Sequence, residues 1–192
     1  VRGFRTGSLF LAAGLVLCVV YFLVPRGNAQ SVLYDLIGVG SSVAIAAAVY
    51  VNKPDFRLPW FLFALGNLFF AVADIIFNII VNPPVPSVAD VFYLAGYPIV
   101  TCGLILLVVR AGGHHRLAAI DEAAIVTIAF ALFQWVWIMD GIKDGPGSVT
   151  ERAVTMAYPG MDVLLLAGLA GFFVTAAWRT PAFVLLVLSL TS

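Results

Sequence analysis

A series of long apolar stretches is the feature that most limits how this chain can fold, because together they occupy most of its 192 residues. The hydrocarbon core of a bilayer is about 30 Å thick, so a helix needs about 20 apolar residues to cross it. Hydrophobic residues make up 62% of the chain and charged residues only 10%, which leaves too few polar side chains to cover a water-soluble surface. We therefore expect an all-α, polytopic membrane helix bundle that forms a single transmembrane domain over residues 1–192.

Seven hydrophobic segments are expected, and the linkers between them are short and rich in glycine, proline and asparagine. The predicted segments are 8–24, 32–51, 59–81, 88–109, 118–139, 152–177 and 181–192. Short linkers predict that successive helices are antiparallel neighbours. The last segment has 12 residues, about 18 Å of helix, and is too short to cross a bilayer. We expect it to be completed in a longer protein.

Basic residues are distributed unequally between the two ends of the predicted helices. Three of them fall at one end: Arg26, Lys143 and Arg152. Seven fall at the other end: Arg2, Arg5, Lys53, Arg57, Arg110, Arg116 and Arg179. Cytoplasmic loops carry the excess of basic residues, so the N-terminus is predicted to lie in the cytoplasm. The net charge is zero, without the clustered positive charge that nucleic-acid binding needs, so the expected partner is the lipid bilayer and not a nucleic acid.

Polar side chains recur at helical spacing inside several of the predicted spans. Residues three, four, seven or eleven positions apart lie on one face of a helix. Polar groups that face hydrocarbon are costly, so these faces are expected to point into the bundle. The candidate ligand-binding residues on them are Asp74, Asp162, Tyr97, Tyr158, Asn67, Asn78, Tyr93 and Asp90.

The depth of the carboxylates predicts a cavity. In the predicted orientation Asp35, Asp74, Asp90 and Asp162 all fall in the outer halves of their helices, and no lysine or arginine lies within a predicted span. We therefore expect an acidic, tyrosine-lined cavity that opens outward, is closed toward the cytoplasm and takes a small ligand, a cation or a proton. No metal site or cofactor is predicted, because the two cysteines lie in different segments and no ligand motif occurs.

Several of these side chains also have a structural interpretation. Asp90 and Glu151 each stand three residues after a serine, where a carboxylate caps the start of a helix. For Asp74 and Asp162 the alternative is a protonated side chain that is hydrogen-bonded to an asparagine or a tyrosine between helices. Asp140 is expected in a loop at the membrane surface.

Two stretches of the sequence repeat one another. Ser87-Val-Ala-Asp90 corresponds to Ser148-Val-Thr-Glu151, and ten residues after each serine comes a Tyr-Pro pair. The copies are 61 residues apart, which is the length of two helices with their linkers. This spacing predicts a duplicated helical hairpin, and the proline of each pair is expected to kink its helix.

Two stretches also carry a resemblance to a known family: PSVADVFYLAGYP at 86–98, followed by Gly103, Leu104 and Arg110, and AYPGMDVLLL at 157–166. Both are similar to the N-terminal multi-helix membrane regions of actinobacterial GGDEF and EAL proteins, the enzymes of cyclic-di-GMP turnover. The similarity runs from about residue 58 to residue 190, and the Tyr-Pro pairs are its most specific part.

The resemblance implies a sensor or anchor in the bacterial plasma membrane, followed by cytoplasmic domains that act as a diguanylate cyclase, a cyclic-di-GMP phosphodiesterase or both. A cytoplasmic domain after a cytoplasmic N-terminus requires an even number of spans, so an eighth helix is expected downstream of residue 192. The chain contains no catalytic motif of these enzymes or of any other class, so no catalytic residue is assigned.

Three functions are compatible with these patterns. The first is a membrane-embedded sensor that detects a small ligand, cation or proton and regulates a cytoplasmic output domain. The second is a small ion-coupled transporter or channel subunit, which the hairpin repeat and the membrane carboxylates favour. The third is a structural anchor or dimerisation platform in which the polar faces hold helices together. Small residues in the segments 32–51 and 152–177 favour a homodimer.

Overall fold

The computed structural model describes the backbone of residues 2–80, 84–111, 116–143 and 145–174, and the side chains of 12–80, 84–110, 121, 124–143 and 145–171. Within these ranges the chain consists of helices joined by short turns. The helices are α1 (Arg2–Leu23), α2 (Asn28–Asn52), α3 (Leu58–Ile79), α4 (Val88–Ala111), α5 (Arg116–Gln134), α6 (Asp140–Lys143) and α7 (Val149–Val174). A π-helical turn, Trp135–Met139, joins α5 to α6.

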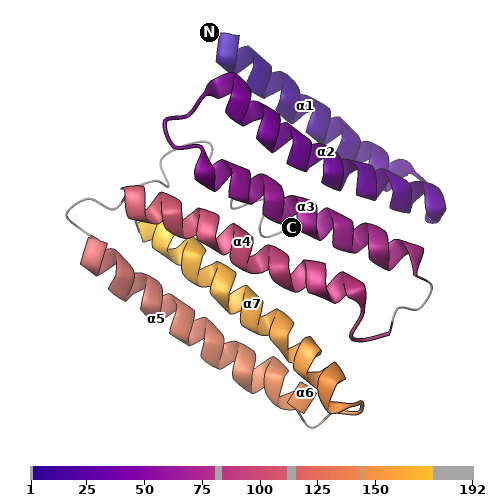
Figure 1. Cartoon of the computed structure of the whole chain (residues 1–192), viewed down its shortest axis with the longest axis vertical. Coiled ribbons are helices and arrows are strands. Elements are labelled where there is room, and N and C mark those ends of the chain that lie inside the picture. Colours follow the sequence, from indigo (N-terminus) through magenta and orange to yellow (C-terminus); the bar gives the residue numbers. More distant parts are fainter. Residues whose placement is uncertain (1, 81–83, 112–115, 144, 175–192) are drawn as a thin grey trace.

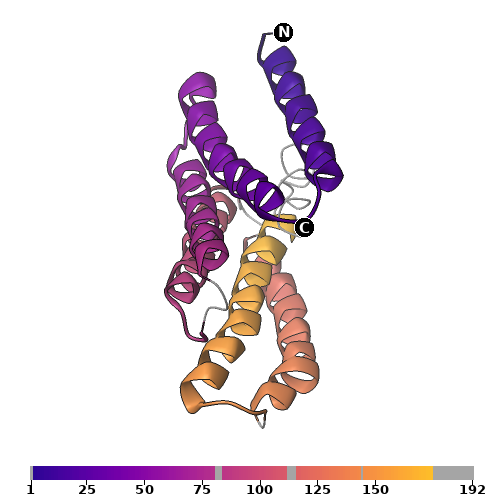
Figure 2. The same ribbon diagram turned by 90° about the vertical axis from the view of Figure 1, so that its right-hand side faces the viewer.

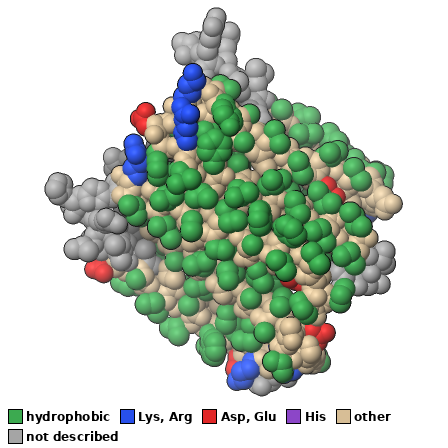
Figure 3. Space-filling model, viewed as in Figure 1, with side chains coloured by type: hydrophobic (Ala, Val, Ile, Leu, Met, Phe, Trp, Pro, Cys, Tyr) green, Lys and Arg blue, Asp and Glu red, His purple; other side chains and the backbone are tan. Residues whose placement is uncertain are grey.

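Among the described residues, five helices are long and apolar enough to cross a bilayer. They are Asn28–Asn52, Leu58–Ile79, Val88–Arg110, Ala124–Lys143 and Val149–Gly171. Large apolar side chains stay exposed along them, and Figure 3 shows a face covered mainly by hydrophobic groups, with Lys and Arg side chains near its edges. Such a surface suits hydrocarbon and not water, so the chain has the exterior of a membrane protein.

The observed helices follow the predicted segments, with differences at their ends. α7 begins before the predicted residue 152, and the helical path that contains the predicted segment 118–139 continues to Lys143. The described apolar part of α1, Ala12–Leu23, is shorter than a membrane span. The predicted segment 181–192, with residues 175–177 and Arg179, lies outside the described residues.

Local side chains explain where α4 and α7 begin. The backbone N–H of Ser148 donates to Glu151 Oε2 at 2.5 Å, and the backbone N–H of Glu151 donates to the Ser148 hydroxyl at 3.1 Å. This is the reciprocal capping box that the sequence predicts. At α4 the backbone N–H and the hydroxyl of Ser87 both donate to Asp90 Oδ2, at 2.6 and 3.1 Å, so the carboxylate half of the box is formed there.

The five long helices pack side by side in the order α2, α3, α4, α7 and α5 (Figure 1). Because α7 lies between α4 and α5, the expectation that successive helices are neighbours is wrong for α4 and α5. The physical reason is that α7 packs closely against α4. A Cβ atom at Gly168 of α7 would lie 3.2 Å from Leu104 of α4. In Figure 2, α1 stands apart from the other helices and diverges from α2 beyond the turn that joins them.

Small residues allow α3 and α4 to approach closely. A Cβ atom at Gly96 would lie 2.7 Å from the Phe70 ring, and one at Gly103 would lie 2.7 Å from the Phe63 ring. The buried core beside them consists of Phe63, Val100 and Leu104. Lipid tails are as apolar as leucine, so close van der Waals packing of this kind is a main source of helix association in membranes. The α3–α4 pair is therefore the centre on which the other helices are arranged.

Three aspartates lie toward the same end of the bundle, which we call the acidic end: Asp35, Asp74 and Asp90. The ends of α1 and α3 and the starts of α2, α4 and α7 lie along this side of the bundle (Figure 1). Lys53, Arg57 and Arg110 lie at the opposite end. α4 and α7 both start at the acidic end, run in the same direction and continue as helices past Pro98 and Pro159.

Candidate functional site

Contacts between aspartates and tyrosine or asparagine side chains connect α2, α3, α4 and α7. We call this set of contacts the polar ladder. Its pairs are Asn78–Asp35, Tyr34–Asp74, Tyr93–Asp74, Tyr158–Asp90 and Tyr97–Asp162. Each pair joins two different helices, so the polar ladder runs through four helices in turn. Hydrogen bonds of this kind hold membrane helices together, because a polar group in hydrocarbon has few other partners.

Asp74 on α3 is the branching point of the polar ladder. Its Oδ1 accepts a hydrogen bond from the hydroxyl of Tyr93 on α4, and its carboxylate also interacts with Tyr34 on α2. Asp35 on α2 is near enough to Asp74 for the two carboxylates to influence each other. Asn78 Nδ2 donates to Asp35 Oδ1 at 2.9 Å. A single side chain on α3 therefore contacts both neighbouring helices.

The tyrosines of the two Tyr-Pro pairs each contact the other's helix. Tyr158 on α7 donates a hydrogen bond to Asp90 Oδ1 on α4, while Tyr97 on α4 interacts with Asp162 on α7. The rings of Tyr93 and Tyr158 lie edge to face, with 6.3 Å between their centroids. The repeated sequence thus produces two contacts of the same kind, made in opposite directions.

Asp90 has a structural role and also belongs to the predicted ligand-binding set. Its Oδ2 caps the start of α4 through Ser87, and its Oδ1 accepts the hydrogen bond of Tyr158. Glu151, at the matching position of the repeat, caps α7. The capping interpretation is therefore correct for both residues, and both carboxylate oxygens of Asp90 are engaged within the protein.

Asn67 belongs to a separate polar cluster farther along α3. Its Nδ2 lies 2.6 Å from Ser41 Oγ, 2.7 Å from Ser42 Oγ and 3.1 Å from the carbonyl oxygen of Gly38. Asn67 precedes Asp74 by seven residues, which is about 10 Å along a helix. These contacts join α3 to α2 and do not reach the polar ladder.

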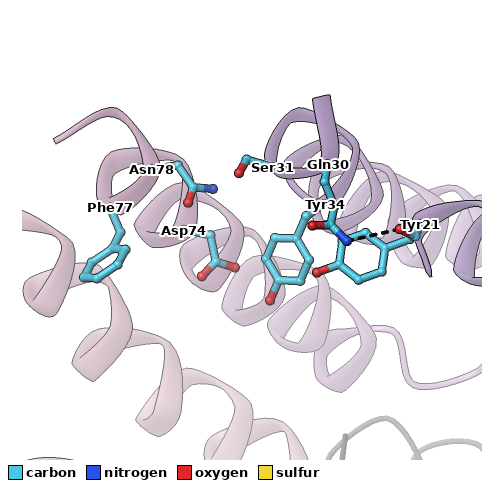
Figure 4. A pocket seen from close by; sticks show the side chains of 7 residues that line it. All are labelled: Tyr21, Gln30, Ser31, Tyr34, Asp74, Phe77 and Asn78. Atoms are coloured by element: carbon cyan, nitrogen blue, oxygen red, sulfur yellow. Dashed lines mark hydrogen bonds between the residues drawn. The ribbon is translucent and has the colours of Figure 1, made fainter. Parts of the chain in front are cut away.

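A pocket of about 170 Å³ lies at the acidic end between α1, α2 and α3 (Figure 4). It is lined by Tyr21, Gln30, Ser31, Tyr34, Asp74, Phe77 and Asn78. Figure 4 shows the Tyr34 ring between Asp74 and Tyr21. Gln30 Nε2 donates to the backbone carbonyl of Tyr21 at 3.2 Å, which joins α2 to the end of α1. The pocket therefore combines three aromatic rings with one carboxylate and three uncharged polar side chains.

Two of the eight predicted ligand-binding residues, Asp74 and Asn78, line this pocket. Five others form or extend the polar ladder away from it: Tyr93, Tyr97, Tyr158, Asp90 and Asp162. The lining residues absent from the predicted set are Tyr21, Gln30, Ser31, Tyr34 and Phe77. On α2, Tyr34 follows Gln30 by four residues and Ser31 by three. This helical spacing is the signal that could have identified them.

In the described part of the chain, no basic side chain forms an ion pair with a carboxylate of the polar ladder. The ion pair found there joins Lys143 to Asp140 at 3.1 Å, on the exposed surface. Asp140 is the first residue of α6, and not a loop residue as the sequence predicts. No three His, Cys, Asp or Glu side chains of the described ranges come together as a metal site. Among the described residues, the side-chain partners of Asp74 are tyrosine hydroxyl groups and not a lysine or an arginine.

Gln134 is a polar residue that no sequence pattern marks. Its side chain is buried, and its Oε1 has no hydrogen-bond partner among the described residues. It is the last residue of α5, directly before the π-helical turn Trp135–Met139. Thr127, seven residues earlier, is the one polar residue that precedes it at helical spacing within the segment, and a single threonine does not mark a polar face.

No protein-family model, no curated protein and no solved structure matches the chain. None of these comparisons connects it to the GGDEF and EAL proteins, so the resemblance of the Tyr-Pro stretches stays an expectation from the sequence. The geometry of the polar ladder and of the pocket therefore carries the functional argument.

Proposed function

We propose that the chain is a membrane-embedded sensor module that binds a small ligand in the pocket between α1, α2 and α3. The pocket lies at the acidic end, which we place on the outer side of a bacterial plasma membrane. Lys53, Arg57 and Arg110 lie at the opposite end, and the positive-inside rule assigns that end, with the N-terminus, to the cytoplasm. The completed bundle is proposed to contain eight spans, of which the described residues supply five.

The double role of Asp74 is the observation that carries this proposal. Its carboxylate lines the pocket, and it also accepts the hydrogen bond of Tyr93 from α4. A ligand that binds this carboxylate must share it with Tyr93 or displace the Tyr93 hydroxyl. Ligand binding and the contact between α3 and α4 are therefore coupled through one side chain.

The polar ladder provides a path from this contact to α7. The Tyr93 ring packs against Tyr158, and Tyr158 donates to Asp90. A change at Tyr93 therefore reaches the contact between α4 and α7. A ligand shifts the equilibrium between two arrangements of α4 and α7 only if its affinities for the two arrangements differ. Competition between the ligand and Tyr93 for Asp74 supplies this difference in affinity.

We propose that α7 and the chain beyond it pass this change to a cytoplasmic output domain. The similarity of the Tyr-Pro stretches to membrane regions of GGDEF and EAL proteins supports a cyclic-di-GMP synthase or phosphodiesterase as that domain. The described chain supplies the input function only.

Thermal unfolding of the chain in lipid nanodiscs, with a panel of small cationic, neutral and anionic compounds, tests the binding step. The proteins compared are the wild type, Asp74→Asn and Asp140→Asn, which alters an exposed carboxylate that does not line the pocket. We expect at least one compound to raise the Tm of the wild type and of Asp140→Asn, but not that of Asp74→Asn. The proposal is wrong if all three proteins fold and no compound gives an Asp74-dependent shift.

The transmission step is measured as the distance between spin labels at Val88 on α4 and Val149 on α7. Both side chains are exposed at the starts of their helices, and the native cysteines, Cys18 and Cys102, are first replaced by alanine. We expect a compound that binds through Asp74 to change this distance distribution. An unchanged distribution in the bound protein would show a binding site without a sensor function.

A structural platform is the second candidate function, and the polar ladder itself favours it. Each carboxylate of the polar ladder has a partner on another helix, as expected of groups whose role is to hold helices together. This role predicts that no compound has an Asp74-dependent effect, although Asp74→Asn still loosens the bundle. Ion-coupled transport instead predicts flux into liposomes that Asp74→Asn abolishes.

A further inference from the structure

We propose that the pocket binds a small organic cation, whose ammonium group lies against the rings of Tyr21 and Tyr34 and faces the carboxylate of Asp74. This inference rests on the proposed function, because it names the ligand class of the same pocket. Four features of the pocket support it: its volume, its aromatic walls, the polarity of its hydrogen-bonding groups and its position beside α1.

The volume of the pocket suits a small cation. The pocket measures about 170 Å³ and is partly open. It therefore holds a methylated amine, and a larger molecule would project from it.

Aromatic rings form the walls on which a cation can lie. The ring centroids of Tyr21 on α1 and Tyr34 on α2 are 6.0 Å apart, and the ring planes are inclined by 48°. Phe77 on α3 adds a third ring to the lining. The face of an aromatic ring is negative, and cages of such faces are a known means of holding quaternary ammonium groups.

The one charged group of the pocket lining is an acceptor. Gln30 Nε2 donates to the Tyr21 carbonyl, and Asn78 Nδ2 donates to Asp35 Oδ1, so one N–H of each amide is used within the protein. The amide oxygens of Gln30 and Asn78 are acceptors, and the carboxylate of Asp74 supplies the negative charge of the lining. Among the described residues no lysine or arginine lines the pocket, so an anion finds no charge partner there and is repelled by Asp74.

A metal ion fits this pocket less well than an organic cation. Ca²⁺ takes six to eight oxygen ligands, and Mg²⁺ demands near-octahedral geometry. The lining contains one carboxylate, and the described residues hold no group of three metal-ligating side chains. Three aromatic rings contribute nothing to the coordination of a hard metal ion, whereas they suit an ammonium group.

The position of the pocket gives the bound cation an effect on α1. α1 diverges from the bundle, and its described contacts with α2 are near the connecting turn, where Tyr21 meets Gln30 and Tyr34 (Figure 2). Tyr21 is the lining residue that α1 contributes. A cation that contacts both Tyr21 and Asp74 therefore ties α1 to α3.

The test uses choline and tetramethylammonium as probes, with the chain in phosphatidylglycerol nanodiscs and empty nanodiscs as the blank. Isothermal titration calorimetry measures the Kd. We expect both cations to bind the wild type, and the neutral isostere of choline, in which carbon replaces nitrogen, to bind at least ten times more weakly. Asp74→Asn is expected to weaken choline binding at least tenfold.

Aromatic variants test the site without changing its charge. Tyr21→Leu and Tyr34→Leu remove a ring face, and each is expected to weaken choline binding by about 2- to 30-fold, the range of a cation–π contact. Tyr21→Phe keeps the face and is expected to bind as the wild type does. Tyr50→Leu is the matched control, because Tyr50 is exposed on α2 and does not line the pocket.

The outcomes separate this inference from the proposed function. If choline does not bind, but a neutral or anionic compound raises the Tm in an Asp74-dependent way, the cation assignment is wrong and the sensor proposal stands. If no compound of any class does so, both are wrong. If choline binds equally to the wild type, Asp74→Asn and Tyr21→Leu, the cation lies elsewhere and this site is wrong.

Two sources can supply an ammonium group at the acidic end, a free solute or a lipid headgroup. Replacing phosphatidylglycerol by phosphatidylethanolamine in the nanodiscs distinguishes them. If the lipid headgroup occupies the pocket, the apparent affinity for choline falls as the ethanolamine lipid is added, and Tyr21→Leu weakens this competition. An affinity that does not depend on the lipid identifies a free solute.

Discussion

Tyr158 on α7 donates a hydrogen bond to Asp90 on α4, a residue 68 positions earlier in the chain that also caps the start of α4. One carboxylate therefore contributes both to where α4 begins and to which helix lies beside it. Tyr97 contacts Asp162 in the opposite direction, so the two Tyr-Pro helices are joined at two levels. These contacts give a physical reason why α7, and not α5, is the neighbour of α4.

Removing the Tyr158 hydroxyl is expected to weaken the contact between α4 and α7. Interhelical hydrogen bonds in membrane proteins contribute about 0.6 kcal/mol on average and up to about 1.7 kcal/mol. Tyr158→Phe should therefore lower the free energy of unfolding in mixed micelles by about 0.5–2 kcal/mol. Tyr50→Phe is the control, since Tyr50 is exposed on α2 and a surface change of this kind stays within about 0.5 kcal/mol. Equal effects of the two variants would contradict a stabilising role for the Tyr158–Asp90 bond.

The close approach of α3 and α4 predicts a large effect of one methyl group. A Cβ atom at Gly66 would lie 3.2 Å from the carbonyl oxygen of Gly96 and would collide with Val100. Overpacking of this kind costs about 1–3 kcal/mol, so Gly66→Ala is expected to destabilise the bundle by that amount. Gly40→Ala on α2 has open space around it and is expected to be neutral or stabilising. Unfolding in mixed micelles compares the Gly66→Ala and Gly40→Ala variants. Equal stability of the two variants would show that α3 and α4 are farther apart than the structure has them.

How far the sequence predicts this fold depends on whether the responsible contacts are local. Ser148 and Glu151 are three residues apart, and their spacing correctly predicts the start of α7. The choice of neighbouring helix is not local. Most of the surface of a membrane helix is apolar, whether it faces lipid or another helix, so hydropathy does not reveal that Gly168 fits against Leu104, which places α7 beside α4.

The same distinction applies to the candidate site. Asp74 could be identified from the sequence because a carboxylate within a membrane span needs a polar partner. Its partner Tyr93 and the pocket wall Tyr21 come from other helices, and only the packing of those helices brings them near. Tyr21 in particular lies at the end of an apolar helix, where a tyrosine is ordinarily explained by the membrane interface.

The capping box at α7 predicts a local effect that can be separated from global stability. Ser148→Ala removes the hydroxyl that accepts the backbone N–H of Glu151, a change that costs about 0.5–2 kcal/mol at a helix start. Faster hydrogen exchange is expected at that amide, while the middle of α7 is unaffected. Ser148→Asp supplies another acceptor and is expected to restore protection. If the aspartate variant exchanges as fast as the alanine variant, the cap does not hold the start of α7.

Tyr93→Phe is expected to separate ligand binding from its transmission. The variant keeps the ring that packs on Tyr158 but removes the hydroxyl that occupies Asp74 Oδ1. Because a cation in the pocket no longer shares this carboxylate with the Tyr93 hydroxyl, choline affinity should stay equal or rise. The change in the distance between spin labels at Val88 and Val149 should be lost, since the bound and free states no longer differ at Tyr93.

Two measurements on the same samples, calorimetry for affinity and the label distance for transmission, check this separation. Tyr50→Phe serves as the control and should keep both the wild-type affinity and the wild-type change in distance. A Tyr93→Phe protein that binds choline and still shows the full change in distance would mean that the signal bypasses Asp74. The signal would then leave the pocket through α1 or α2, because Tyr21 and Tyr34 of these helices also line the pocket.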